Sequence, residues 1–240
     1  MIGIFIRVNQ LYFNKNGVIV ETDRCFAEPE DQMKDAKSPI AGIVLAAGMS
    51  TRLGSAKQLV RADGQYLLDR VLDGALASCL DRIILVLGHR AEEVSAVLKE
   101  RDDRDRLRIL INPAYRDGMS SSLRTGIEGV QDTFSAIMIL LGDQPFVRAE
   151  LIDLLIRRFR SSEKDICVPV CRGRRGHPVI IGRRFYDAVM STTGDIGARQ
   201  ILKSNPDSIL GVEISDSRIF FDVDTPADIT KMQSRFPQKI

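Results

Sequence analysis

The stretch that most constrains this chain covers residues 40–57 and reads IAGIVLAAGMSTRLGSAK. It begins with a short apolar run of the kind that forms a buried parallel strand, and then breaks into two alanines and a glycine before a polar loop. Small residues at these positions let backbone N–H groups approach a phosphate or a base closely. The stretch therefore predicts a loop that binds a flat, anionic ligand.

Two cations, Arg52 and Lys57, follow in this loop with Gly54 between them. Backbone amides and two positive side chains suit a triphosphate, whose charge must be neutralised before a nucleophile of like sign can approach. The pattern is neither G-x-x-x-x-G-K-[ST] nor G-x-G-x-x-G. An ordinary strand-to-helix loop with two solvated cations is the alternative, but the coincidence of so many special positions favours a nucleotide site.

The length and composition limit the classes of protein to which this chain can belong. A chain of 240 residues with 44% hydrophobic content fits one large α/β domain with a sizeable core. The net charge of +2 argues against nucleic acid as a partner. No apolar run approaches the roughly 20 residues that span a bilayer, so we expect a soluble protein without a membrane partner.

The amino terminus lacks the basic front and the cleavage site of a signal peptide. The four cysteines are scattered, so we expect no disulfide framework and a reducing cytoplasm as the location. Cys167 and Cys171 are expected to be buried as small hydrophobic side chains, because two thiols without nearby partners cannot complete a zinc site.

Residues 1–38 are expected to form an appendage or linker, folded or disordered, ahead of one domain at residues 39–240. A hairpin is predicted from residues 2–8 and 18–21, with a turn at Asn16-Gly17, and a charged, turn-rich run follows at residues 28–37.

From residue 40 onward, apolar strand-like segments alternate with segments of helical periodicity. This alternation predicts crossover connections and a mostly parallel sheet covered on both faces, a three-layer α/β/α Rossmann-like fold. Beyond the strand in residues 40–46, strands are expected at residues 82–87, 108–112, 136–141, 166–170, 178–181, 209–214 and 219–223, and helices at 67–80, 91–100, 120–130, 149–160, 184–190, 197–204 and from 226.

Four polar segments are expected at the carboxyl ends of these strands, where such sheets bind ligands. They are residues 46–57, 118–123, 142–145 and 222–226. Because stretches far apart in the chain converge on one edge, this edge is the predicted site.

Acidic residues in two of these segments indicate a metal site. Asp143 directly follows an apolar strand, where Mg²⁺ is a natural partner because it takes one or two carboxylates and completes its shell with phosphates. Asp222 and Asp224 are predicted on one face of a strand end, aimed at the same ion. The alternatives are helix caps at Asp143 and Asp224, while Asp228 is expected to complement the dipole of the last helix.

Two further segments carry binding chemistry. Gly118 and the hydroxyls of Ser120, Ser121 and Ser122 lie at a helix start, which can bind an anion or the edge of a base, although simple capping by Ser120 is an even alternative. His177 follows the basic run Arg172, Arg174 and Arg175, which suits an anionic second substrate or a solvated loop. The segment at residues 194–199 opens another helix and is predicted to close over that ligand.

The motifs LAAGxSxRxGxxK, GMSSSL, GDQP, RGHPV, GDIGAR and DVDTPxD occur in this order. In this combination the chain resembles the molybdenum cofactor cytidylyltransferase family, within the larger group of MobA-like nucleotidyltransferases. The resemblance leaves residues 1–38 outside. Leu53 stands where the family usually has methionine, a volume-conserving difference that changes the expectation little.

The resemblance implies transfer of CMP from CTP to the terminal phosphate of molybdopterin carrying molybdenum, with release of pyrophosphate. It implies Mg²⁺ or Mn²⁺ held by Asp143, Asp222 and Asp224, and catalysis by Arg52, Lys57 and Asp143. With the patterns above, nucleotide binding is assigned to Leu45, Ala46, Ala47, Gly48, Ser50, Arg52, Lys57, Gly118, Ser120, Ser121, Ser122 and Asp143, and acceptor binding to His177, Asp195 and Arg199.

Related guanylyltransferases read LAGG where this chain has Leu45-Ala46-Ala47-Gly48, so the methyl group of Ala47 favours cytosine over a purine. The alternatives are a nucleotidyltransferase that uses GTP or another phosphorylated acceptor, and a non-catalytic carrier that delivers the cofactor to a molybdoenzyme. A redox enzyme is less expected, because the loop lacks a dinucleotide fingerprint.

Overall fold

The computed structural model describes residues 12–13, 19–20, 38–49, 57–99, 101, 105–130 and 133–235. By its internal contacts the chain divides into residues 1–32 and residues 33–240. In the first unit, β1 (Tyr12–Phe13) pairs antiparallel with β2 (Ile19–Val20). The strand expected at residues 18–21 overlaps β2, whereas the one expected at 2–8 lies outside the described residues.

The second unit is built on an eight-stranded, mostly parallel sheet with the strand order β10-β9-β11-β8-β3-β6-β7, and β12 pairs with β9. The strands are β3 (Ile40–Ala46), β6 (Arg82–Leu87), β7 (Leu107–Ile111), β8 (Ala136–Leu141), β9 (Ile166–Cys171), β10 (Arg174–Arg175), β11 (Val179–Gly182) and β12 (Ile209–Glu213). β3 is parallel to both β6 and β8. β11 runs antiparallel to both of its neighbours, β8 and β9.

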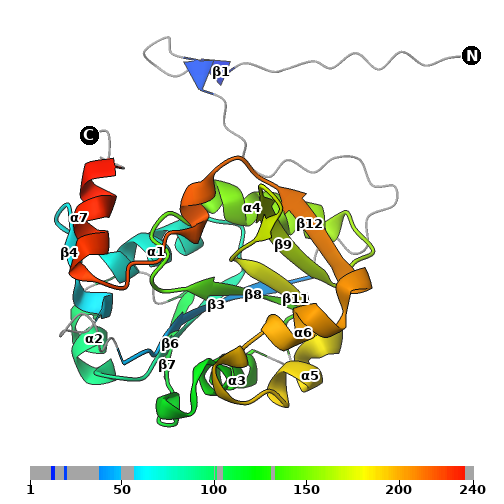
Figure 1. Cartoon of the computed structure of the whole chain (residues 1–240), viewed down its shortest axis with the longest axis horizontal. Helices are drawn as coiled ribbons and strands as arrows, with labels where there is room; N and C mark the ends of the chain where they lie inside the picture. Colours follow the sequence, from blue (N-terminus) through cyan, green and yellow to red (C-terminus); the bar gives the residue numbers. More distant parts are fainter. Residues whose placement is uncertain are drawn as a thin grey trace, which may run out of the picture. The chain divides into compact units, whose positions relative to one another are not determined.

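Helices cover both faces of this sheet, as Figure 1 shows. On one face, α1 (Leu67–Leu76), α2 (Ala91–Leu98) and α4 (Ala149–Arg160) share a buried cluster with alternate residues of the strands. On the other, α3 (Met119–Glu128), α5 (Tyr186–Met190) and α6 (Arg199–Ser204) share a second cluster. This confirms the predicted α/β fold with its three layers.

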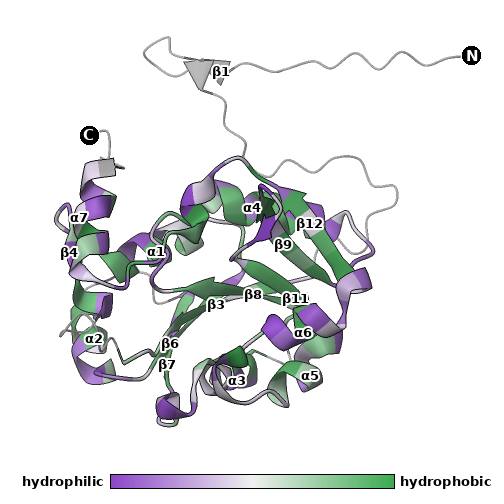
Figure 2. Ribbon diagram, in the orientation of Figure 1, coloured by the Kyte–Doolittle hydropathy of each residue, from purple (hydrophilic) through white to green (hydrophobic). Residues whose placement is uncertain are grey.

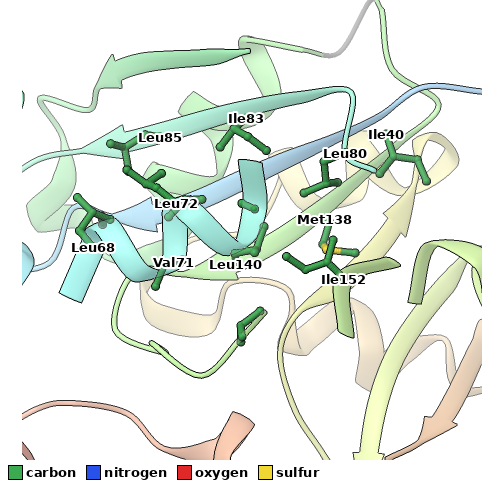
Figure 3. Close-up of a cluster of buried hydrophobic side chains, with 14 of the residues drawn as sticks. Ile40, Leu68, Val71, Leu72, Leu80, Ile83, Leu85, Met138, Leu140 and Ile152 are labelled. Atoms are coloured by element: carbon green, nitrogen blue, oxygen red, sulfur yellow. The ribbon is translucent and has the colours of Figure 1, made fainter. Parts of the chain in front are cut away.

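The sheet is apolar on both faces because successive strand residues point to opposite sides. Ile43 belongs to the cluster under α3, whereas Val44 belongs to the cluster under α1. Figure 2 shows the central strands as hydrophobic almost throughout. In Figure 3, Leu68, Val71 and Leu72 of α1 pack onto the side chains of the sheet.

The last helix, α7 (Pro226–Arg235), packs on a separate, smaller core. Met232 contacts the cluster formed by Ala62, Leu67, Phe146 and Val223. Ala62 belongs to a short hairpin of β4 (Arg61–Ala62) and β5 (Gln65–Tyr66), which the sequence patterns did not predict. This small core ties the segment at residues 221–224 to the loop after β8.

The strand expected at residues 219–223 is wrong. The chain there forms a 3₁₀ helix, η6 (Ser217–Phe220), followed by irregular backbone. Asp216 ends the preceding extended chain by accepting a 3.0 Å hydrogen bond from the Arg218 N–H, and the helix buries Ile219. Apolar side chains that suggested a strand are therefore buried by a turn of helix instead.

Cys167 and Cys171 are free and buried, as expected. Cys79 departs from the expectation of a chain without disulfides, because it is disulfide-bonded. Among the helices in the described part of the chain, none is both long and apolar enough to cross a membrane.

The packing of α1 on the sheet predicts how much a cavity there would destabilise the folded state. Leu72 is fully buried between α1 and the sheet, so Leu72→Ala should lower the free energy of unfolding in urea by about 2–5 kcal/mol. Ile111→Ala is the control, because Ile111 is 55% exposed at the end of β7, and the expected change is within about 0.5 kcal/mol. Equal effects of the two substitutions would contradict the assigned core.

Candidate active site

The loop after β3 begins at the carboxyl edge of the sheet. Ala46 and Ala47 are buried, while Gly48 and Met49 are exposed. Ser50, Arg52 and Gly54 lie outside the described residues, so their expected contacts with a nucleotide stay predictions. The chain is described again from η1 (Lys57–Leu59), where the Gln58 side-chain amide donates to the carbonyl of Ala46 and holds Lys57 near the strand end.

Lys57 brings two of the predicted carboxylates together. Its Nζ lies 2.8 Å from Oδ2 of Asp143 and 2.7 Å from Oδ1 of Asp224. The Lys57 side chain is 13% exposed, so these contacts are shielded from water more than a surface ion pair is. Residues 86 and 167 positions apart in the sequence therefore meet at one point.

Backbone contacts explain why the carboxylates are close. The Gly142 N–H donates to the carbonyl of Leu45 at 3.0 Å, which extends the pairing of β8 with β3 to the residue before Asp143. The Val223 N–H donates to the carbonyl of Asp143 at 3.1 Å. The segment with Asp222 and Asp224 is thus attached to the end of β8 without being a strand of the sheet.

Asp222, the third predicted ligand, is held by a different partner. Its Oδ1 accepts a 2.8 Å hydrogen bond from Nε2 of Gln144. Burial raises the pKa of Asp222 although part of its side chain is exposed, and the negative charges of Asp143 and Asp224 add to the shift against the effects of Gln144 and Lys57. The three carboxylates therefore lie close enough to influence one another.

The donor set is one that a hard divalent cation prefers, because it consists of carboxylate oxygens. Oδ1 of Asp143 is buried and has no hydrogen-bond partner in the part of the chain that is described. Within that part, no group of three His, Cys, Asp or Glu side chains is placed to hold a metal ion, and the ammonium of Lys57 lies between Asp143 and Asp224. An ion would take over from Lys57 as their partner, and the assignment of the three ligands stays a prediction.

His177 lies beside these carboxylates. Its Nδ1 is 3.4 Å from the carbonyl of Ile139 in β8. Burial lowers the pKa of His177, and the charges of Asp143 and Asp222 counteract only part of this shift while Arg199 adds to it. These mutual effects place His177, Arg199 and two carboxylates in one neighbourhood, with the imidazole neutral at pH 7.

The three serines of α3 face the protein. Ser120 accepts a 3.2 Å hydrogen bond from the Gly197 N–H, and the Asn112 amide donates to Ser121 and Ser122 at 2.8 and 3.0 Å. All three are almost fully buried. Their hydroxyl groups fix the start of α3, and nucleotide binding by them stays a prediction.

Asp195 also has a contact that the sequence did not suggest. Its Oδ1 accepts a 3.0 Å hydrogen bond from the Met119 N–H, so it caps α3 from a distant segment. A Cβ on Gly118 would lie 2.5 Å from the carbonyl carbon of Gly194, so only a glycine allows the two backbones to approach this closely. The segment η4 (Gly194–Ile196) therefore lies against the start of α3, and acceptor binding by Asp195 stays a prediction.

Sequence reasoning missed two residues of this neighbourhood, Gln144 and Asn112. Gln144 follows Asp143 in the GDQP motif, and Asn112 ends the strand expected at residues 108–112, but the sequence patterns assign neither residue a role. Each is a buried amide that joins distant segments. A buried amide signals such a link only once the fold is known.

Comparison with known proteins places the fold and these residues in one family. Residues 42–209 match the model of the MobA-like NTP transferase domain, a range that contains Lys57, Asp143 and His177. The chain belongs to the MobA-like NTP transferase family. It is a nucleotidyltransferase by this membership, as the sequence motifs predicted.

Individual relatives cover most of this chain. The molybdenum cofactor cytidylyltransferase of Escherichia coli is 28% identical over 84% of this chain and 99% of its own length. The nicotine blue oxidoreductase of Paenarthrobacter nicotinovorans is 32% identical over 80% of this chain and 96% of its own length.

Solved structures share the fold. The crystal structure of Rv0371c from Mycobacterium tuberculosis is 27% identical, with a TM-score of 0.71 over 82% of this chain and 98% of that one. Rv0371c has also been solved in complex with manganese, with a TM-score of 0.68, 24% identity, and coverage of 82% of this chain and 98% of that one.

The raised pKa of Asp222 predicts how stability depends on pH. The folded state binds this proton more tightly than the unfolded state does, so the charge destabilises the folded state as the pH rises above the ordinary value of 3.8. Asp222→Asn removes the charge and keeps an oxygen for Gln144. We expect a higher melting temperature than wild type at pH 7, and a difference that disappears as the pH falls below 3.8.

Asp228→Asn is the control of opposite sign. The hydrogen bond from Thr225 lowers the pKa of Asp228, and bonds from the backbone of Asp224 and Thr225 act in the same direction. Its charge therefore stabilises the folded state above the ordinary pKa, and the variant should melt lower than wild type at pH 7. An Asp222→Asn protein that melts below wild type at pH 7 would contradict the assigned environment.

Proposed function

We propose that this member of the family is a divalent-metal-dependent cytidylyltransferase. It transfers CMP from CTP to the terminal phosphate of molybdenum-loaded molybdopterin and forms molybdopterin cytosine dinucleotide. The observation that carries the proposal is the contact of Lys57 with Asp143 and Asp224 at the carboxyl edge of the sheet. The similarity to the E. coli molybdenum cofactor cytidylyltransferase over nearly its whole length supports the choice of substrates.

The reaction joins two phosphates. An oxygen of the acceptor phosphate attacks the α-phosphorus of CTP, and the bond from this phosphorus to the bridging oxygen breaks, so that pyrophosphate leaves with the electron pair. The acceptor oxygen is already anionic at neutral pH, so the protein needs no general base. Positioning and charge stabilisation are what the chain must supply.

Lys57 places a positive charge beside Asp143 and Asp224. Released from its carboxylates, its ammonium can stabilise the equatorial oxygens of the α-phosphate or the departing pyrophosphate. Arg52 is proposed to act with it from the same loop. The neutral imidazole of His177, with Arg199 nearby, is proposed to hydrogen-bond the anionic acceptor on the side of the carboxylates.

Asp143, Asp222 and Asp224 are proposed to hold Mg²⁺ or Mn²⁺. A bound divalent cation would neutralise charge on the two phosphates as they approach. The manganese complex of Rv0371c, a protein of the same fold, is in keeping with such a cation. We propose that the enzyme works in the cytoplasm and passes its product to a molybdoenzyme.

Apolar side chains beside the site suit an acceptor with a flat ring system. Met119 and Ile196 are 37% and 46% exposed, although large apolar side chains are usually buried. They belong to neighbouring segments, because Asp195 binds the N–H of Met119 and the sulfur of Met119 packs beside Gly197. This wall lies at the start of α3, at the same edge as the end of β3.

The deciding experiment incubates the full chain with Mg²⁺, one of the four NTPs and molybdenum-loaded molybdopterin, and measures pyrophosphate. We expect release with CTP that depends on both the acceptor and the metal. Release with another phosphorylated acceptor alone would replace the acceptor in this proposal. Tight binding of the cofactor without release would favour a carrier.

A second candidate is an oxidoreductase, which the similarity to nicotine blue oxidoreductase favours. The loop after β3 lacks the G-x-G-x-x-G pattern that many dinucleotide-binding enzymes use. The two functions can be distinguished by the products that they form. A reductase would oxidise NADH or NADPH in the presence of a quinonoid dye, which is followed by the absorbance of the reduced cofactor. It would release no pyrophosphate from CTP.

Removal of one charge tests the catalytic assignment. Lys57→Ala and Asp143→Ala should each lower the rate of pyrophosphate release at least about a hundredfold, the scale of one preorganised charge, while far-ultraviolet circular dichroism stays that of wild type. Lys164→Ala is the control, because Lys164 donates to the carbonyl of Asp207 at an exposed position and should be dispensable. Near-normal rates in either site variant would refute the assignment.

Base selection is tested at Ala47. Ala47→Gly removes one methyl group beside the proposed base and should raise the use of GTP relative to CTP. One methyl group is worth only about 1–3 kcal/mol, so the expected change in the ratio of kcat/KM values is on the order of tenfold. An unchanged ratio would show that base selection lies elsewhere.

A further inference from the structure

Gln144 has an environment that the transfer reaction itself does not explain. It directly follows Asp143 and is 5% exposed. Its Nε2 donates the 2.8 Å hydrogen bond to Oδ1 of Asp222, 78 residues further along the chain. Because an ionised carboxylate only accepts hydrogen bonds, this contact fixes the orientation of the amide and leaves Oε1 for another partner.

Two side-chain oxygens of consecutive residues lack a donor in the described part of the chain. Oε1 of Gln144 and Oδ1 of Asp143 are both buried and have no hydrogen-bond partner among the residues that the structure describes. A buried acceptor without a donor destabilises the folded state, so two of them on consecutive residues suit a ligand that supplies donors. A hydrated divalent cation does this, because Mg²⁺ usually keeps several of its waters when it binds carboxylates.

Asp222 needs a partner to stay in place. It lies in irregular backbone between η6 and α7 and reaches the surface. The charges of Asp143 and Asp224 repel it, and Lys57 contacts those two residues at 2.8 and 2.7 Å. Among the described hydrogen bonds, the one from Gln144 is what draws the Asp222 carboxylate toward the site.

We propose that Gln144 is a positioning residue of the cation site. Its Nε2 holds the Asp222 carboxylate beside Asp143, and its Oε1 accepts a hydrogen bond from a water molecule of the bound cation. The inference rests on the proposed function, because it concerns the cation of the same reaction. Residues that orient metal ligands in this way typically change metal affinity or activity by about 10–100-fold when they are replaced.

The test is Gln144→Met, which nearly keeps the volume and removes both the donor and the acceptor. Binding of Mn²⁺ is measured by electron paramagnetic resonance in the presence of a non-hydrolysable CTP analogue. We expect the dissociation constant for Mn²⁺ to rise about 10–100-fold. The Mn²⁺ concentration that half-activates pyrophosphate release should rise in parallel.

Gln65→Met is the matched control. Nε2 of Gln65 donates to Oδ2 of Asp73 at 2.6 Å, an amide-to-carboxylate bond of the same type at an exposed position in β5. Its Mn²⁺ affinity should equal that of wild type. A lower melting temperature of Gln144→Met with wild-type Mn²⁺ affinity would mean a purely structural role and would overturn the proposal.

Gln144→Asn gives the same test if the methionine variant does not fold, because it keeps the amide but withdraws it by one methylene. We expect the same weakening of Mn²⁺ binding, and wild-type affinity in this folded variant would likewise overturn the proposal. Failure of the proposed function is recognised separately. A wild-type protein that releases no pyrophosphate refutes cytidylyl transfer, while its Mn²⁺ binding still decides the role of Gln144.

Discussion

The contact of one ammonium with two carboxylates holds the candidate site together. Lys57 lies within 2.8 Å of Asp143 and of Asp224, which come from the end of β8 and from the segment before α7. Like charges at one edge of a sheet repel one another unless a cation lies between them. Each of the other features, from the hydrogen bond of Gln144 to the placement of His177, concerns the same excess of negative charge.

The topology explains why His177 lies near Asp143. Parallel strands end at one edge, so the loops after β3 and β8 meet there. β11 runs in the opposite direction, between β8 and β9, and therefore begins at that edge. His177 comes just before β11, so one reversed strand brings a loop from late in the chain beside Asp143. An all-parallel order would place that loop at the other edge.

The sequence predicted the strands and the edge because both depend on local patterns. The apolar runs of β6 and β8 and the periodicity of α4 have the expected bounds, and small residues or Asp143 follow the strands where expected. The strand predicted at residues 219–223 is wrong because a 3₁₀ helix that buries an apolar side chain and a short strand share an apolar pattern. The roles of Ser121 and Asp195 depend on partners that no local pattern reveals, since their contacts join separate segments.

The charges of the described site also give a reason for the proposed reaction to use a further cation. Three carboxylates outnumber the positive charges of Lys57 and the nearby Arg199, so a triphosphate that approaches this edge meets net negative charge from the described residues. When Lys57 turns from Asp143 and Asp224 to a phosphate, those carboxylates lose the contact with its ammonium. A divalent cation held by these carboxylates would compensate their charge and would attract the phosphates. Nucleotide and metal should then stabilise each other in the site, since each removes the charge that opposes the other.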